Sequence, residues 1–468
     1  MAANADDAGR GPGTKRYRLL DGHKRSVGPT IQELHGQERR AVPAALRDDH
    51  PADLGDEDLP NTRYFSPSIH QLEMARMWSK TWQLACRLED IPNAGDHVLY
   101  TIGDDDLIVT RVDATTVKAY HNACLHRGRR LRDEPGSVSA FRCAFHGFTW
   151  RLDGRLSYAP CAWDFDHVDF DTQWRLPEAR VGLWGGFVFI CLAPDTPDLD
   201  TYLEGIPAHF SPYAMEHRVK AVHVRKLMPG NWKLVAEAFI ESFHVMVTHP
   251  EAAGYIGDAN SQYDVYPGVK HWNRMIVPRG LASPQGAAMD DLDILRASGD
   301  LGADAAAIPA GMTARMVIAD QRRALLERQF GVDTASVSDC EAIDTIQYFL
   351  FPNMAVWAGY NSFICYRWLP NGHDPDSSWM DVMLLAPVGP DRPRPATAKP
   401  TVLAPQQAWS EAKALGGLGH VFDQDTANIA ALQRGLKASK KPGVTLAHYQ
   451  ESRIRHFAKT LEHYLAET

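Results

Sequence analysis

The chain has 468 residues, of which 44% are hydrophobic and 23% are charged, as is usual for a globular protein with a large buried core. This length allows two or three domains. The formal net charge of −9 provides no basic surface for nucleic acid. No apolar run approaches the roughly 18–20 residues that a membrane-spanning helix needs. We therefore expect neither a nucleic acid nor a membrane among the partners.

The cysteines and the N-terminus bear on the cellular compartment. The seven cysteines, an odd number, are scattered over the chain and do not suggest a disulfide framework. The first residues, MAANADDAGRGPGTKRYR, lack the apolar core of a secretory signal. Both observations favour a reducing, cytoplasmic location.

The N-terminal part of the chain reads as an arm followed by a helix. Residues 1–60 are rich in charge, Gly and Pro without sustained periodicity, which predicts an extended or disordered arm exposed to solvent. A helix is expected over 61–81, with Ser66 as its N-cap and an apolar face that ends at Trp82. We expect this helix to pack on the C-terminal part of the chain.

The rest of the chain predicts two domains of different character. Over 82–195, short strand-like segments are separated by turn residues, which indicates a small all-β domain with a hairpin turn at 103–106. Over 196–468, a helical segment at 231–248 precedes several strand-like segments that are typical of an antiparallel sheet. The predicted fold class is therefore α+β.

Two short loops of the all-β domain each offer one thiol and one imidazole. Cys124 and His126 form the first pair, and Cys143 and His146 follow after sixteen intervening residues. A zinc finger usually groups its cysteines in one pair and its histidines in the other. Mixed pairs let two cysteines bind one metal while two histidines bind its neighbour, which suits a [2Fe–2S] cluster. With its flanking residues the stretch reads CLHRG…CAFHGFTW and resembles the Rieske iron–sulfur domain.

A second group of histidines lies in the helical segment. On a regular helix, His244 and His249 would point about 140° apart. They converge only if the helix ends between them or widens into a π-type turn, and Pro250 favours an end. Glu237 and Glu241 recur on the same stripe as His244. Taken alone, such a pair of histidines is weak evidence for a metal site.

The surrounding segment strengthens the case. NWKLVAEAFIESFHVMVTHP resembles the mononuclear iron motif of Rieske non-heme iron oxygenases, and it follows the first motif at the family's spacing of about 100 residues. The resemblance implies that His244 and His249 bind iron. It also implies an aspartate ligand within GHVFDQDTANIAALQRGL, where alignment favours Asp425 and leaves Asp423 as the alternative. Either acid could instead cap a helix or lie on the surface.

The resemblance gives Glu241 a separate role. In the family an acid at this position links the first iron histidine to a cluster histidine across a subunit interface. A carboxylate that accepts the ring N–H fixes the tautomer of the histidine. We expect Glu241 to be this electron-transfer bridge.

The implied protein is the α (catalytic) subunit of a Rieske non-heme iron, aromatic ring-hydroxylating oxygenase, with an antiparallel sheet flanked by helices. Its cofactors would be a [2Fe–2S] cluster and a mononuclear Fe(II), with NAD(P)H acting only through a ferredoxin or a flavin reductase. A homotrimer, with or without a separate β subunit, and a small apolar or aromatic substrate are expected. O- or N-demethylation and quaternary-amine oxidation remain alternatives. A Rieske-type electron carrier and a structural zinc protein are the rivals outside this class.

Overall fold

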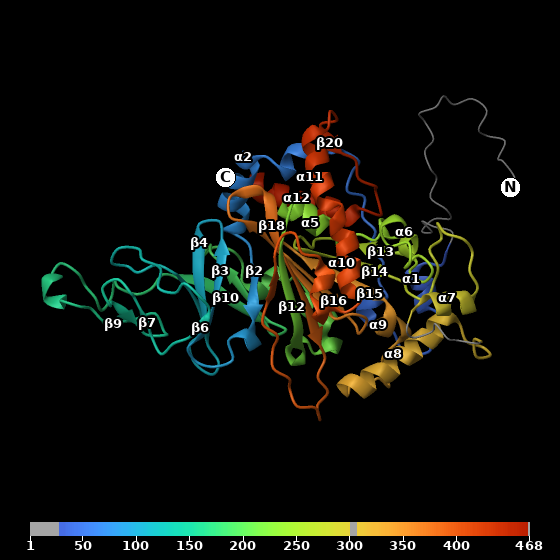
Figure 1. Ribbon diagram of the computed structural model, residues 1–468, viewed down its shortest axis with the longest axis horizontal. Coiled ribbons are helices and arrows are strands. Elements are labelled where there is room, and N and C mark those ends of the chain that lie inside the picture. The colour runs from blue at the N-terminus through green and yellow to red at the C-terminus, as the bar shows by residue number, and fades with distance from the viewer. Residues whose placement is uncertain (1–27, 300–306, 467–468) are drawn as a thin grey trace.

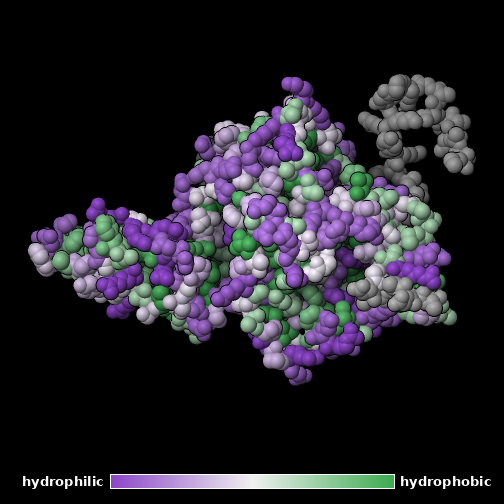
Figure 2. Space-filling view, in the orientation of Figure 1, coloured by the Kyte–Doolittle hydropathy of each residue, from purple (hydrophilic) through white to green (hydrophobic). Residues whose placement is uncertain are grey.

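The computed structural model describes residues 28–299 and 307–466, which form a slender β domain at one end of the molecule and a larger mixed domain (Figure 1). The first 27 residues of the expected N-terminal arm lie outside the described residues. No helix in the described part of the chain is long and apolar enough to cross a membrane. Hydrophilic side chains are spread over both domains on the face seen in Figure 2, with apolar ones scattered among them.

The β domain contains an antiparallel seven-stranded sheet and a small three-stranded one. In spatial order the larger sheet consists of β2 (Gln83–Arg87), β11 (Phe187–Cys191), β10 (Glu178–Trp184), β5 (Val117–His121), β4 (Asp105–Arg111), β3 (Asp96–Ile102) and β6 (Gly136–Ser137). The smaller sheet consists of β7 (Phe141–Arg142), β8 (Thr149–Trp150) and β9 (Leu156–Tyr158). The predicted hairpin turn joins β3 to β4 at Gly103, whose φ of 57° is a backbone conformation that glycine adopts without strain.

The larger domain is built on an eight-stranded sheet. In spatial order it contains β13 (Gln262–Asp264), β14 (Trp272–Val277), β15 (Thr345–Leu350), β16 (Met354–Ala358), β17 (Ile364–Asn371), β18 (Asp374–Ala386), β12 (Val219–Met228) and β19 (Thr401–Leu403). All neighbours are antiparallel except β12 and β19. Every residue of β14, β15 and β16 is buried, because both faces of the sheet are covered; their sequences therefore show little alternation of apolar and polar residues.

Twelve helices in the described part of the chain accompany the two domains, and α8 and α12 are the longest of them. They are α1 (Ile31–His35), α2 (Pro67–Glu73), α3 (Leu199–Tyr202), α4 (Ile206–Phe210), α5 (Trp232–Glu237), α6 (Val245–Thr248), α7 (Asp291–Ala297), α8 (Ala314–Phe330), α9 (Asp339–Ile343), α10 (Leu418–Ala427), α11 (Ile429–Ala438) and α12 (Ser452–Ala466). The C-terminal helix α12 buries Ile454, Phe457 and Leu461 at helical spacing, as the sequence pattern predicts. The α+β class predicted from the sequence is confirmed.

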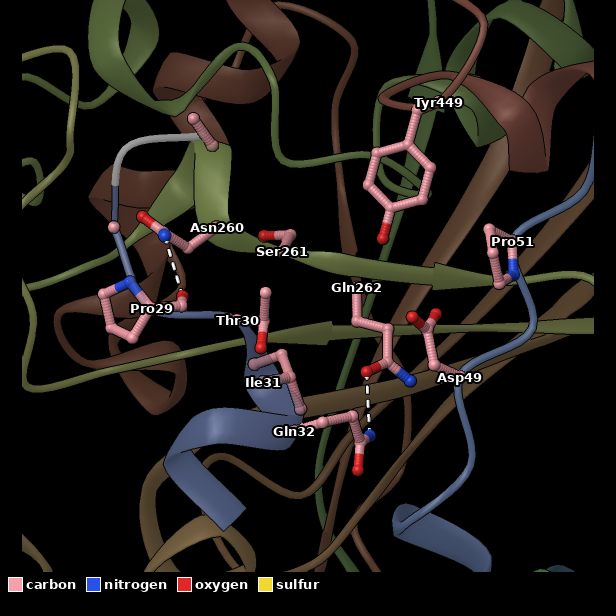
Figure 3. Close-up of a pocket in the computed structure, with 12 residues that line it drawn as sticks. Pro29, Thr30, Ile31, Gln32, Asp49, Pro51, Asn260, Ser261, Gln262 and Tyr449 are labelled. Atoms are coloured by element: carbon pink, nitrogen blue, oxygen red, sulfur yellow. Dashed lines mark hydrogen bonds between the residues drawn. The ribbon is translucent and has the colours of Figure 1, made fainter. Parts of the chain in front are cut away.

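Residues 28–60 pack on the larger domain, in contrast to the solvated arm expected from composition. Ile31 and Leu46 are 1% exposed, which places their side chains in the core. Asn260 Nδ2 donates to the Pro29 carbonyl at 2.8 Å, and Gln32 Nε2 donates to Gln262 Oε1 at 2.9 Å (Figure 3). Sparse apolar residues therefore anchor this segment even though its overall composition is polar.

The expected helix over 61–81 is divided into shorter pieces. Ser66 is the predicted N-cap and accepts a hydrogen bond from Ile69 N, so that α2 begins at Pro67. After Glu73 the chain widens into a π-turn over Met74–Trp78 and then leaves the helix. Near its start, β1 (Leu59–Pro60) pairs with β20 (Gly443–Val444) and ties this region to the C-terminal part of the chain.

Candidate metal centres

The structure brings three predicted ligands together in the larger domain. One ligand atom each from His244, His249 and Asp425 lie within 4.8 Å of one another, and this group could hold a metal ion. Nε2 of His249 lies 2.7 Å from Asp425 Oδ1, and Nε2 of His244 lies 3.3 Å from the same oxygen. The Asp425 side chain is 7% exposed. Two imidazoles and one carboxylate are the donor set of the facial iron triad.

The histidines converge because the helix is interrupted. The continuous helical segment predicted over 231–248 is wrong: α5 ends at Glu237, and after a non-helical stretch α6 forms a single turn over Val245–Thr248. His244 precedes this turn, and His249 follows it with non-helical backbone angles of φ −126° and ψ 61°. Because α6 ends at Thr248, the ring of His249 can turn toward His244. This is the first of the two alternatives, a helix end rather than a π-type turn.

The residues that open this segment anchor it in the core. Asn231 caps α5 by accepting a hydrogen bond from Lys233 N. Trp232 Nε1 donates to Glu73 Oε2 at 2.9 Å, and Lys233 Nζ forms a buried ion pair with Glu73 Oε1 at 2.6 Å. These contacts attach α5 to the end of α2. The Asn-Trp-Lys sequence therefore positions α5 and supplies none of the candidate metal ligands.

The outer nitrogen of each histidine also has a defined partner. Nδ1 of His244 lies 2.5 Å from Glu241 Oε1, and Nδ1 of His249 lies 2.7 Å from Gln424 Oε1. Since both partner atoms are acceptors, each Nδ1 carries the proton and each Nε2 is left for a metal. Sequence reasoning missed Gln424; the only available signal was its position next to Asp425.

Burial and charge compete at this group. Burial, the largest effect, lowers the pKa of His244, but the Glu241 and Asp425 carboxylates outweigh it and raise the pKa to about 10. The pKa of His249 is also raised, because Asp425 and Gln424 outweigh burial. Burial raises the pKa of Asp425, yet its bonds to both histidines lower it overall. The site therefore favours positive charge at its centre, which a divalent cation supplies.

The two candidate aspartates have different environments. Asp423 Oδ1 accepts a hydrogen bond from Trp409 N at 2.6 Å, and its Oδ2 accepts one from Ser410 N at 3.2 Å. Asp423 therefore holds a neighbouring turn, whereas Asp425 faces the histidines from α10. The reading of Asp425 as a helix start is wrong, because α10 already began at Leu418.

Glu237 is not one of the three candidate ligands that meet, although its spacing placed it on the same stripe as Glu241. Its Oε2 accepts a hydrogen bond from the Tyr64 hydroxyl at 2.7 Å, and its Oε1 lies 3.8 Å from Arg63 Nη2. The helical stripe is lost because α5 ends at this residue. Glu237 instead anchors the N-terminal region.

A cavity of about 530 Å³ opens beside the three candidate ligands. Its wall includes Phe239, Tyr366 and Phe422 together with His244, His249 and Asp425. A second cavity of about 270 Å³ also contacts Glu241, His244 and Asp425. The candidate centre is thus accessible to a small molecule, with a wall that is largely apolar.

The first predicted centre lies on two matched loops of the β domain. The Cys124 carbonyl accepts from Gly128 N at 2.8 Å, and the Cys143 carbonyl accepts from Gly147 N at 3.0 Å. Both glycines have positive φ, 73° and 86°, which the tight turns require. The same local geometry therefore presents the Cys-x-His and the Cys-x-x-His pairs.

The four side chains of these loops meet with cysteines inside and histidines outside. Cys124 and Cys143 are 3% and 2% exposed, while His146 is exposed and His126 is half-buried. The Nδ1 atoms of the two histidines lie 3.1 Å apart. Burial raises the pKa of the Cys124 thiol, and its contact with Cys143 adds to this effect. Two thiols and two imidazoles on opposed loops fit a [2Fe–2S] cluster with two iron sites of different ligation.

Comparison with known proteins agrees with both centres. Residues 81–168 match the model of the Rieske [2Fe–2S] domain. Residues 213–467, more than half of the chain, match the model of the ring-hydroxylating α subunit (catalytic domain). The chain thus combines a Rieske domain with a ring-hydroxylating catalytic domain. The chain belongs to the family of ring-hydroxylating α subunits.

Curated relatives fall into two groups. The chain is 35% identical over 216 residues to the glycine betaine monooxygenase oxygenase subunit of Chromohalobacter salexigens. This alignment covers 45% of this chain and 48% of that protein. It is 28% identical over 216 residues to the biphenyl dioxygenase subunit alpha of Paraburkholderia xenovorans, covering 43% of this chain and 47% of that one. The matches thus span about half the length of these relatives.

Solved structures share the fold. A quaternary ammonium Rieske monooxygenase in complex with γ-butyrobetaine superposes with a TM-score of 0.61 at 15% identity, over 88% of this chain and 96% of that one. Naphthalene 1,2-dioxygenase with bound indole gives a TM-score of 0.62 at 17% identity, over 89% and 94%. At these identities the likeness concerns the fold alone.

Proposed function

We propose that this chain is the oxygenase component of a Rieske non-heme iron system that uses dioxygen and two electrons to oxidise a small molecule. The observation that supports this most is the meeting of His244, His249 and Asp425 at the wall of a largely apolar cavity. The Cys/His loops of the β domain supply a second donor set, suited to electron transfer. Neither an electron carrier nor a structural zinc protein accounts for both donor sets and the cavity.

The proposed ligands are the thiol, imidazole and carboxylate groups that meet in the two candidate centres. Cys124, His126, Cys143 and His146 would hold the [2Fe–2S] cluster, and His244, His249 and Asp425 would hold the mononuclear Fe(II). When bound, the cluster would supply one-electron transfer and the iron a site for dioxygen. The protein's own contribution is to fix the ligands: Glu241 and Gln424 hold the Nδ1 protons and thereby direct both Nε2 atoms into the cavity.

We propose further that electrons pass between subunits. Figure 1 shows β7, whose end carries one Cys/His loop, at one end of the molecule, away from α6 and α10, which carry the second ligand group. A ring-like homotrimer would bring the cluster of one subunit to the iron of the next, and Glu241 would bridge them. A ferredoxin or a flavin reductase would deliver electrons from NAD(P)H. None of the seven cysteines forms a disulfide, which fits the proposed cytoplasmic location.

The proposed substrate is a small aromatic compound, which would be mono- or dioxygenated. The rings of Phe239, Tyr366 and Phe422 line the cavity and suit an aromatic guest. A second candidate, oxidation of a quaternary amine, is favoured by the 35% identity to the glycine betaine monooxygenase subunit. Aromatic faces also attract a trimethylammonium group, so the walls fit both substrates.

Metal analysis followed by oxygen uptake tests the proposed function. We expect about three irons and two acid-labile sulfides per chain, and uptake of dioxygen with a surrogate reductase when a substrate panel is supplied. Zinc without sulfide would support the structural zinc protein. Two irons per chain after iron loading would support the electron carrier.

A further inference from the structure

One face of the large sheet forms a wall of the cavity. Met275 and Val277 of β14, Gln347 of β15 and Tyr366 of β17 all line it. Met275 and Val277 are two residues apart, as side chains on one face of a strand must be. Arg279, two residues beyond Val277, continues this series and also lines the cavity. The sheet thus carries one cationic side chain into a largely apolar chamber.

The backbone of Arg279 is held firmly in place. Its N–H donates to Asp344 Oδ1 at 2.9 Å, and its carbonyl accepts from Arg315 Nη1 at 3.0 Å. It also forms an isolated antiparallel bridge with Ile256. The direction of the side chain is therefore fixed by the fold before any ligand binds.

The guanidinium of Arg279, in contrast, makes no hydrogen bond or ion pair with any residue in the described part of the chain, and its Nε atom is buried without a partner. Asp344, which accepts the Arg279 backbone N–H, is already engaged by another arginine: its Oδ1 accepts from Arg315 Nη1 at 2.6 Å and its Oδ2 from Nη2 at 2.9 Å. Arg315 also contacts Glu38 at 3.1 Å. The two acids of this cluster are therefore occupied by Arg315.

A second arginine increases the local positive charge. Arg322 donates its Nε–H to the Tyr360 carbonyl at 2.9 Å and stacks on Phe363, 5.2 Å from the ring centroid. Burial, followed by the charge of Arg279, lowers the pKa of Arg322 to about 10. Two half-buried cations thus lie within electrostatic reach of each other, and within the described residues Arg279 forms no ion pair.

A buried charge without a partner is costly, since the lost hydration is not replaced. Proteins keep such a group where a ligand completes its hydrogen bonds. Trp357, which lines the same cavity, also has a buried Nε1 atom without a partner. Arg and Trp side chains can only donate, so both groups call for an acceptor on the guest.

The cation and the candidate iron ligands belong to one chamber. Burial, followed by the charge of Asp425, raises the pKa of the Tyr366 hydroxyl, while Arg279 opposes this rise. Tyr366 is therefore within electrostatic reach of both groups. A guest held at Arg279 would lie along Tyr366 with its other end toward Asp425.

We infer that the cavity binds a substrate with a carboxylate group, which the guanidinium of Arg279 receives, while the part to be oxidised lies toward His244, His249 and Asp425. A carboxylate matches the planar fork of a guanidinium with two parallel hydrogen bonds. The orientation of the substrate toward the iron ligands rests on the proposed function. The binding of the carboxylate by Arg279 does not depend on it. An aromatic acid and a trimethylammonium acid both satisfy it.

Anaerobic calorimetry on the iron-loaded protein tests the inference without turnover. The probes are two matched pairs, benzoate with benzamide and glycine betaine with choline, in which the second member lacks the carboxylate. For at least one pair we expect the carboxylate to bind at least about tenfold tighter than its partner. In Arg279→Met this preference should fall below about twofold, chiefly through weaker binding of the carboxylate member, and Arg279→Lys should retain part of it.

A matched control removes an arginine outside the cavity. Arg225 stacks on Trp379, 4.7 Å from the ring centroid, and does not line the cavity. Arg225→Met should keep the full preference for the carboxylate. A wild-type protein without preference in both pairs, or an Arg279→Met protein that keeps it, would overturn the inference.

Thermal unfolding separates binding from a structural role. Because the Arg279 guanidinium has no partner among residues 28–299 and 307–466, Arg279→Met should leave the melting temperature unchanged or raise it, whereas removal of a structural arginine would lower it. Carboxylate binding through Arg279 without any oxygen incorporation would refute the proposed function alone. Oxygenation that ignores the carboxylate would refute the inference alone.

Discussion

Oε1 of Glu241 lies 2.5 Å from Nδ1 of His244, so the carboxylate holds the outer nitrogen of a ring whose inner nitrogen faces Asp425. The side chains of Glu241 and His244 are 11% and 25% exposed. Both side chains line two cavities, of about 530 and 270 Å³, through which solvent reaches the pair. The proposed bridge to a neighbouring subunit would need such access.

Replacement of Glu241 by Gln tests the bridge. The amide keeps the size of the side chain but loses its charge, so we expect both metal centres to remain loaded while electron transfer slows at least about tenfold. Single-turnover measurements of cluster oxidation provide the readout. Glu251 lines the same cavity, and Glu251→Gln should keep the wild-type rate. An unchanged rate in Glu241→Gln would refute the bridge.

Alanine substitutions distinguish the two aspartates. Asp425→Ala should reduce the iron content from about three to about two per chain, retain the colour of the cluster and abolish product formation. Asp423→Ala removes a cap from the turn at Trp409 and should cost about 1 kcal/mol of stability while iron stays bound. Iron retained in Asp425→Ala would contradict the ligand assignment.

Gln424 is expected to act through His249. In Gln424→Leu the ring loses the acceptor of its Nδ1 proton, so its orientation and tautomer are no longer fixed. We predict iron affinity weakened by about 10–100-fold, measured by competition with a chelator. Gln424→Glu keeps an acceptor and should bind iron nearly as well as wild type. Equal affinities for all three proteins would exclude this positioning role.

The buried Lys233–Glu73 pair is predicted to stabilise the attachment of α5 to α2. Lys233→Met leaves the Glu73 carboxylate uncompensated in the core, which should cost about 3–5 kcal/mol in denaturant unfolding. Lys233→Met combined with Glu73→Gln removes the charge, keeps an acceptor for Trp232 and should recover part of this loss. A double variant less stable than the single one would contradict this explanation.

Acid should destabilise the protein partly through His456. Burial, the largest effect, lowers the pKa of His456 to about 4, against 6.5 for an ordinary histidine. The unfolded chain therefore binds the proton first, and stability falls as the pH drops from about 6.5 to about 4. At pH 5 the expected loss is about 2 kcal/mol. In His456→Gln this part of the loss between pH 7 and pH 5 should disappear, whereas His420→Gln, at an exposed histidine, should leave it unchanged.

The local parts of both centres could be predicted from the sequence. The Cys-x-His and Cys-x-x-His loops are short, and each closes on itself through a glycine with positive φ, so residue type and spacing already define them. The strands of the β domain and the cap at Ser66 are equally local. The sequence also contained the donor types for the second centre, in the family's order.

What only the tertiary structure decided depends on contacts between distant segments. Asp425 rather than Asp423 meets the histidines because α10 turns the Asp425 side chain toward them and the Asp423 side chain toward Trp409, and 176 residues separate His249 from Asp425. The same placement of α10 brings Gln424 to His249, and only the folded chain shows that the Arg279 guanidinium in the cavity has no partner among the described residues. Spacing along the chain fixes which side chains can act together only within a turn or a loop; beyond that, burial and packing choose among them.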